Sequence, residues 1–224
     1  MIQCVAFDFD GTLVDSNEIK RRAFFEVVSD HDPEGSVVAE VLDEIRPGDR
    51  FDVAREIARL LTLRGTLPDD HGAEDLVRRW VEAYTRRCEE AVSECPEIPG
   101  ATAALEWLAE RGIALYVNSS TPEEPLRRVL RRRSMDRHFR RIYGRPASKL
   151  ANLRSIREDA GVAREELLYV GDGEDDRNAA EAFGCHFAGV VRPCRNPFAL
   201  VPRHRIDDLW GLAKVVERIQ EEAP

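Results

Sequence analysis

The chain has 224 residues, of which 43% are hydrophobic and 33% charged, and its formal net charge is −9. This composition is typical of a globular protein with one sizeable core, or one core and a small satellite domain. The acidic balance argues against general attraction to nucleic acid or anionic membranes, and no apolar run approaches the ~20 residues that span a bilayer. No signal-peptide pattern opens the sequence, so we expect a cytoplasmic protein.

An apolar run at residues 4–7 is followed at once by two acids, Asp8 and Asp10, and then by Gly11. We expect a buried strand that ends in a turn, because the carboxyl ends of strands are where open α/β sheets bind ligands. Two acids at an apolar strand end repel each other unless a cation lies nearby, and Mg²⁺ prefers such oxygen ligands. The alternative is that one acid caps a helix and the other is solvated.

Residues 17–95 form successive helical patterns, in which apolar side chains recur three and four positions apart. The segment 46–49 breaks this pattern, and the stretch 66–72 is rich in turn residues. We therefore expect a helical domain at 16–95, inserted between the first strand and the remainder of the chain. Residues 1–15 and 96–224 would then form the main domain.

From residue 96 onward, short apolar segments alternate with helical ones. Strands alternating with helices predict a parallel sheet covered on both faces, which is an α/β fold of the doubly wound type. The predicted strands are 113–117, 141–143, 167–170 and 186–190, and the predicted helices are 101–111, 122–133, 149–160 and 176–183.

Two segments after predicted strands carry groups suited to an anion. Asn118, Ser119 and Ser120 stand before a helix, where hydroxyls and backbone N–H groups bind phosphate well, although an ordinary helix cap would look the same. Lys149 stands at the start of a helix, which is the unfavourable end of the helix dipole for a cation. Most surface lysines are simply solvated, and that alternative stays open here, but the unfavourable position makes Lys149 a candidate for binding an anion.

Four acids follow the predicted strand 167–170 within five residues, namely Asp172, Glu174, Asp175 and Asp176. Such crowding is unfavourable unless a cation or solvent relieves it. An acidic helix start explains Glu174 and Asp175 equally well. Asp172 and Asp176 are therefore the candidates for a metal site.

The segment DFDGTLVDS at residues 8–16 resembles the nucleophile motif of the haloacid dehalogenase-like hydrolases, and the three segments around Ser119, Lys149 and Asp172 resemble the family's other motifs in the same order. The resemblance implies a Rossmann-like core with a type 1 helical cap at 16–95. It also implies Mg²⁺-dependent hydrolysis of a small-molecule phosphate monoester. In that reaction Asp8 would form an aspartyl-phosphate and Asp10 would act as general acid and base.

The resemblance further assigns binding roles. Lys149 would neutralise charge during catalysis, with Arg145 as the alternative cation, and Lys20 and Arg50 of the helical domain would contact the substrate. The implied metal ligands are Asp8, Asp10, Asp172 and Asp176, and the implied phosphate ligands are Gly11, Ser119, Ser120 and Lys149.

Other functions remain open at this point. A sugar phosphomutase like beta-phosphoglucomutase would share the fold and nucleophile, although such mutases typically carry Glu-Asp where this chain has Gly171-Asp172. A non-catalytic protein that binds anions or nucleic acid is the alternative from a different class, and its one support is a basic segment at 127–141 with eight arginines. As partners we expect a small phosphorylated metabolite, such as a sugar phosphate or phosphoglycolate, and neither membrane nor nucleic acid, with the chain a monomer or homodimer. The five cysteines form no CxxC pair and are expected to be reduced.

Overall fold

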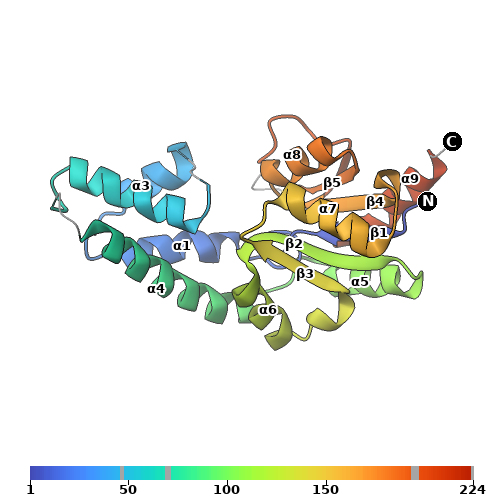
Figure 1. The fold of residues 1–224 in the computed structure, drawn as a ribbon, viewed down its shortest axis with the longest axis horizontal. Coiled ribbons are helices and arrows are strands. Elements are labelled where there is room, and N and C mark those ends of the chain that lie inside the picture. The colour runs from blue at the N-terminus through green and yellow to red at the C-terminus, as the bar shows by residue number, and fades with distance from the viewer. Residues whose placement is uncertain (46–47, 69–71, 193–196, 223–224) are drawn as a thin grey trace. The chain divides into compact units, whose positions relative to one another are not determined.

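The computed structural model describes residues 1–45, 48–68, 72–192 and 197–222. The chain divides into two compact units, one formed by residues 1–16 and 93–224 and the other by residues 17–92. The first unit contains the sheet, and the second is helical (Figure 1).

The sheet has six parallel strands in the order β3-β2-β1-β4-β5-β6. The chain starts in the middle of the sheet and winds first to one side and then to the other, which confirms the predicted doubly wound fold. Phe7 at the end of the first strand is paired with Val117 and Val170 of its two neighbours. The strands are β1 (Cys4–Phe7), β2 (Ala114–Pro122), β3 (Arg141–Arg145), β4 (Leu167–Gly171), β5 (His186–Val190) and β6 (His204–Ile206).

Helices cover both faces of this sheet. On one side α7 (Lys149–Ala160) and α8 (Glu174–Phe183) pack against each other, and on the other side lie α5 (Ala101–Glu110) and α6 (Glu123–Arg132) (Figure 1). The terminal helix α9 (Leu212–Glu221) packs against α5. Neither β6 nor α9 was predicted. For β6 the reason is that a strand of three residues gives almost no periodic signal.

The core follows from the apolar character of the strands. Every residue of β1 and β4 is buried, as expected for parallel strands with helices on both faces. Two tyrosines, Tyr116 and Tyr169, are completely buried on the face that packs against α7 and α8. A buried tyrosine needs a partner for its hydroxyl. Tyr116 donates to Asp159, and Tyr169 lies where the sheet meets the polar residues described below.

The helical unit contains α1 (Asn17–Val28), α2 (Ser36–Glu40), a π-helical turn at Val41–Ile45, α3 (Arg50–Leu63) and most of α4 (Ala73–Glu94). Phe24 of α1 stacks on Tyr84 of α4 with 4.2 Å between the ring centres. The π-helical turn continues directly from α2 and ends just before the break predicted at 46–49. Residues 46 and 47 of that break lie outside the described residues, and Asp49 caps α3.

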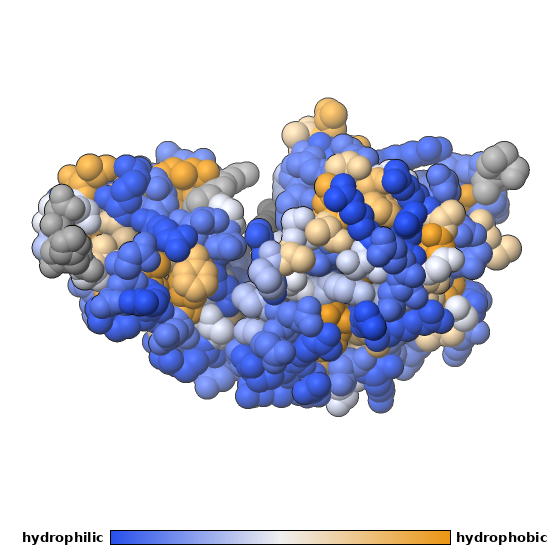
Figure 2. Space-filling view, in the orientation of Figure 1, coloured by the Kyte–Doolittle hydropathy of each residue, from blue (hydrophilic) through white to orange (hydrophobic). Residues whose placement is uncertain are grey.

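The face of the molecule in Figure 2 is mainly hydrophilic, and apolar side chains are scattered over it. Within the described part of the chain, no helix combines the length and apolar character required to cross a membrane.

Candidate active site

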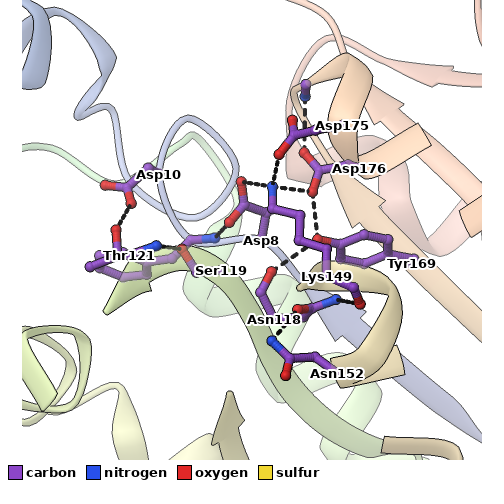
Figure 3. Close-up of polar contacts among 12 residues, drawn as sticks. Asp8, Asp10, Asn118, Ser119, Thr121, Lys149, Asn152, Tyr169, Asp175 and Asp176 are labelled. Carbon is purple, nitrogen blue, oxygen red and sulfur yellow. Dashed lines mark hydrogen bonds and ion pairs between the residues drawn. The ribbon is translucent and has the colours of Figure 1, made fainter. Parts of the chain in front are cut away.

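Polar residues converge at the carboxyl edge of the three central strands. Asp8 follows β1, Asn118 and Ser119 lie in the last part of β2, and Asp172 follows β4. These strands are neighbours in the sheet, so residues more than a hundred positions apart are brought together (Figure 3). This edge is the position where doubly wound folds bind ligands.

Asp8 is held rigidly at the end of β1. Its backbone N–H donates to the carbonyl of Val170 at 2.8 Å, and its Oδ1 accepts from the backbone N–H of Phe9 at 2.7 Å. The chain then turns sharply at Gly11, whose φ of 77° lies in the left-handed region that favours glycine. The side chain of Asp8 is nevertheless 9% exposed, which leaves part of its carboxylate accessible.

Lys149 points its ammonium group into a set of acids. The Nζ atom lies 3.2 Å from Asp8 Oδ2, 2.6 Å from Asp176 Oδ1 and 2.9 Å from Asp175 Oδ2 (Figure 3). Lys149 is the first residue of α7, which Ser148 caps, and its side chain is 8% exposed. The acids therefore compensate for a cation at the unfavourable end of the helix.

Asp176 is completely buried and accepts hydrogen bonds from several residues of the site. Its Oδ1 accepts from Lys149 and from the Tyr169 hydroxyl at 2.5 Å, and its Oδ2 accepts from the backbone N–H of Gly173 at 3.0 Å. Gly171 permits this packing, because a β-carbon at that position would lie 2.4 Å from Asp176 Cγ. The residue that ends β4 must therefore be very small for Asp176 to occupy this place.

Three of these carboxylates form a group suited to a divalent ion. Asp8, Asp172 and Asp176 each place an oxygen within 4.8 Å of the others'. Hard oxygen ligands in a partly buried group of this size are the donors that Mg²⁺ takes. The residues present therefore fit the Mg²⁺ that the sequence predicted.

The electrostatics of the group lead to the same conclusion. Burial raises the pKa of Asp8, and it raises the pKa of Asp176 well above its usual range. For both residues the positive charge of Lys149 lowers the pKa, whereas the neighbouring carboxylates raise it further. Burial alone would lower the pKa of Lys149, but Asp176, Asp8 and Asp175 together raise it well above its usual value. One ammonium group thus faces several carboxylates, and additional positive charge would relieve their repulsion.

Asp10 lies apart from this group. Its Oδ1 accepts from the Ser16 hydroxyl at 2.7 Å and its Oδ2 accepts from the Thr121 hydroxyl at 2.8 Å. Because the strand ends at Phe7 and the chain turns, the carboxylate of Asp10 does not join those of Asp8, Asp172 and Asp176.

The predicted phosphate-binding segment is ordered by its neighbours. The side chain of Asn118 donates to the carbonyl of Lys149 and accepts from Asn152, both at 3.0 Å, so its amide is used for structure. Ser119 is buried, and its Oγ accepts from the backbone N–H of Thr121 at 3.2 Å. Ser120 is half-buried. Of the three candidates, Ser119 and Ser120 are therefore better placed than Asn118 to bind an anion.

The other candidate residues belong to other elements of the chain. Arg50, in the helical unit, donates to Thr85 Oγ1 at 2.8 Å and packs over the ring of Tyr84. Lys20 is a half-buried residue of α1, and Arg145 is a half-buried residue at the end of β3. The structure places Lys149, rather than Arg145, against Asp8.

The basic segment is partly used within the protein. Arg127 pairs with Glu123 and Arg141 pairs with Asp159, and Arg133 donates to the carbonyls of Ser93 and Cys95. Three of the eight arginines of this segment therefore have partners within the protein.

Sequence reasoning missed two residues of the site, Tyr169 and Thr121. Tyr169 gave no signal, because a tyrosine in an apolar strand is indistinguishable from a core residue. Thr121 belongs to a visible hydroxyl cluster, but its contact with Asp10 joins the end of β2 to the turn after β1, which is 111 positions away. Asp175 was explained as part of an acidic helix start, and it also pairs with Lys149.

Comparison with known proteins agrees with this geometry. A family model described as haloacid dehalogenase-like hydrolase matches residues 2–184. The chain belongs to this family. The hydrolase is 30% identical over 204 residues to a phosphoglycolate phosphatase of Cereibacter sphaeroides, a match that covers 89% of this chain and 90% of the relative. It is therefore an enzyme of the phosphatase branch of the family.

Two solved structures show the same fold as this hydrolase. A predicted phosphoglycolate phosphatase from Haemophilus somnus 129PT superposes with a TM-score of 0.77 at 18% identity, covering 96% of this chain and 98% of that one. CbbY from Rhodobacter sphaeroides, in complex with phosphate, superposes with a TM-score of 0.71 at 23% identity, covering 95% of this chain and 96% of that one.

Proposed function

We propose that this hydrolase cleaves a small-molecule phosphate monoester through a phosphorylated Asp8, with Mg²⁺ as its cofactor. The observation that carries the proposal is the carboxylate of Asp8 at a strand end, 3.2 Å from the ammonium group of Lys149 and grouped with Asp172 and Asp176. The carboxylate proposed as the nucleophile is thus accessible, lies next to a fixed cation and belongs to a group of acids that can bind a metal ion.

The chain's own residues would carry the reaction in two half-reactions. Asp8 attacks phosphorus in line and displaces the alcohol, while Asp10 donates a proton to the leaving oxygen. Asp10 then takes a proton from the water that hydrolyses the aspartyl-phosphate. Lys149 holds Asp8 in place and offsets the negative charge of the transferring phosphoryl group.

Asp8 and Asp172 are the residues that would hold Mg²⁺ most directly. Asp176 makes three hydrogen bonds within the chain, so it acts mainly by fixing Lys149 and completing the charge of the group. When bound, the ion screens the repulsion between the anionic nucleophile and the anionic substrate. Ser119, Ser120 and the backbone at Gly11 are the groups proposed to bind the phosphate oxygens, together with Lys149.

The geometry around Gly171 favours hydrolysis over a mutase activity. A glutamate at this position, as in mutases that resemble beta-phosphoglucomutase, would bring its β-carbon to 2.4 Å from Asp176 Cγ. The sheet end is therefore built around glycine. A mutase would return the phosphoryl group to a second hydroxyl of the sugar, and hydrolysis releases it to water.

The test is turnover of p-nitrophenyl phosphate by the purified protein. We expect activity with Mg²⁺, none after addition of EDTA, and none in Asp8→Asn, which keeps the shape of the side chain but removes its nucleophilic charge. Retention of wild-type turnover in Asp8→Asn would refute the proposal. Failure to release inorganic phosphate from sugar phosphates, with phosphate moved to another hydroxyl instead, would favour the mutase.

The substrate itself is proposed only as a class. The relative from Cereibacter sphaeroides is named a phosphoglycolate phosphatase, so phosphoglycolate is the first compound to test. A panel of phosphorylated metabolites that includes hexose and pentose phosphates should then rank kcat/KM. Lys20 and Arg50 remain candidate substrate contacts, and substitution of either should raise KM more than it lowers kcat.

A further inference from the structure

We infer that Thr121 is a positioning residue. Its hydroxyl holds the carboxyl group of Asp10 in the orientation that Asp10 needs to transfer protons in the reaction. This inference rests on the proposed function, because it assumes that Asp10 exchanges protons with the leaving group and with water. The contact itself is the hydrogen bond from Thr121 Oγ1 to Asp10 Oδ2, 2.8 Å long (Figure 3).

The bond joins two segments that the chain sequence keeps far apart. Asp10 lies in the turn after β1, and Thr121 lies at the end of β2, which is the neighbouring strand. The Ser16 hydroxyl binds the other oxygen of Asp10, so each carboxylate oxygen carries one hydroxyl. Two donors on opposite oxygens fix the plane of the carboxyl group.

Thr121 is itself held in place by the irregular end of β2. The register between β2 and β3 shifts between Asn118 and Pro122, so this part of the strand departs from the regular ladder. The backbone N–H of Thr121 donates to Ser119 Oγ. Its carbonyl packs so closely on Gly144 that a β-carbon there would lie 2.5 Å from the oxygen. The hydroxyl is thus presented from a fixed backbone, which is what positioning requires.

A hydroxyl is suited to a partner that alternates between two protonation states. It donates to a carboxylate and can rotate to accept from a carboxylic acid, so Asp10 keeps this partner through both half-reactions. A valine has the same shape but offers neither interaction. Loss of the hydroxyl should therefore reduce proton transfer and leave phosphate binding nearly unchanged.

The experiment compares two leaving groups in the full-length enzyme with Mg²⁺. An alkyl phosphate expels a strongly basic alkoxide and needs proton donation, whereas p-nitrophenolate leaves without it. We expect Thr121→Val to lower kcat/KM for the alkyl phosphate about 10-fold, part of the full effect of a general acid. The loss for p-nitrophenyl phosphate should be no more than about 2-fold. Thr121→Ser should restore most of the loss.

Thr102→Val is the matched control, because the Thr102 hydroxyl also donates to a carboxylate, that of Glu97 at 2.7 Å, and neither residue is assigned a role in the proposed reaction. It should leave both substrates unaffected. Thr121→Ala supplies a second variant without the hydroxyl if Thr121→Val does not fold, as judged by circular dichroism. Equal losses for both leaving groups, no rescue by serine, or wild-type rates in Thr121→Val would each overturn the inference.

These results are separable from a failure of the proposed function. If Asp8→Asn is inactive and Thr121→Val behaves as wild type, only the role of Thr121 is refuted. If Asp8→Asn keeps its activity, the proposed nucleophile is wrong whatever Thr121 does.

Discussion

The ammonium group of Lys149 lies 3.2 Å from the carboxylate of Asp8, across 141 positions of sequence. The two residues come from different elements, since Asp8 follows β1 and Lys149 opens α7. Their proximity gives the proposed nucleophile a fixed counter-charge before any substrate arrives.

Removing that charge should slow the reaction. We expect Lys149→Ala to lower kcat for p-nitrophenyl phosphate by ~10²-fold or more, because the transferring phosphoryl loses its neutralising partner. Lys214→Ala is the control, since Lys214 is an exposed residue of α9. Full activity in Lys149→Ala, together with inactivity in Arg145→Ala, would transfer the role to Arg145.

Asp10→Asn should impair both half-reactions. An amide can neither protonate the leaving oxygen nor take a proton from water, and general acid–base groups contribute about 10²- to 10⁴-fold to rates. With p-nitrophenyl phosphate, whose leaving group needs no proton, the phosphorylated enzyme should accumulate and be detectable by intact-protein mass spectrometry. The same accumulation should be absent in Asp8→Asn. Wild-type kcat in Asp10→Asn would remove Asp10 from the mechanism.

Metal binding should stabilise the protein by relieving the crowded carboxylates. Mg²⁺ binds the native state, so Tm should rise with its concentration, and EDTA should reverse the rise. Asp172→Asn removes one of the three charges, so we expect a higher Tm without metal and a much smaller response to Mg²⁺. Asp207→Asn, at an exposed position, should respond as wild type. An unchanged Mg²⁺ response in Asp172→Asn would contradict the assignment.

The thiols of Cys4, which is buried, and of Cys185, which is half-buried, should be unreactive at ordinary pH. Burial raises the pKa of Cys4 and of Cys185 to about 12, from a model-compound value of 9.0. A raised pKa keeps the folded thiols protonated while unfolded thiols ionise, so the stability that burial of the neutral thiols contributes is fully present below about pH 9 and is lost as the pH rises to about 12. At pH 8 neither residue should react with a disulfide reagent until denaturant is added, as peptide mapping would show. Labelling of native Cys4 would contradict this; Cys194 lies outside the described residues.

Asp32 should stabilise the helical unit. Its Oδ2 accepts from the backbone N–H groups of Val37 and Val38, both at 2.9 Å, and so satisfies two donors at the start of α2. Asp32→Ala should lower the free energy of unfolding by about 1–2 kcal/mol, measured by urea denaturation. Asp30→Ala, at an exposed neighbouring position, should change it little. Equal effects of the two substitutions would show that the cap contributes nothing.

Much of the fold was predictable because it depends on local patterns. The bounds of α7 and β5 match the predicted segments 149–160 and 186–190, since helical and strand periodicity, a capping serine and a glycine stop are all local signals. The predicted strand at 113–117 is longer in the structure and ends at Pro122. A strand that carries polar residues at the edge of a core has no apolar alternation to reveal it.

The sequence by itself indicated the candidates for the chemistry, because acids and hydroxyls follow apolar strands and a lysine stands at the unfavourable end of a helix. Only the tertiary structure decided how they divide. It placed Asp8, Asp172 and Asp176 in one group, and it placed the carboxylate of Asp10 where the hydroxyls of Ser16 and Thr121 donate to it. It also placed Tyr169 on Asp176. The physical reason is that these contacts depend on strand order and on the turn after β1, which bring distant residues within a few ångströms and leave no trace in local spacing.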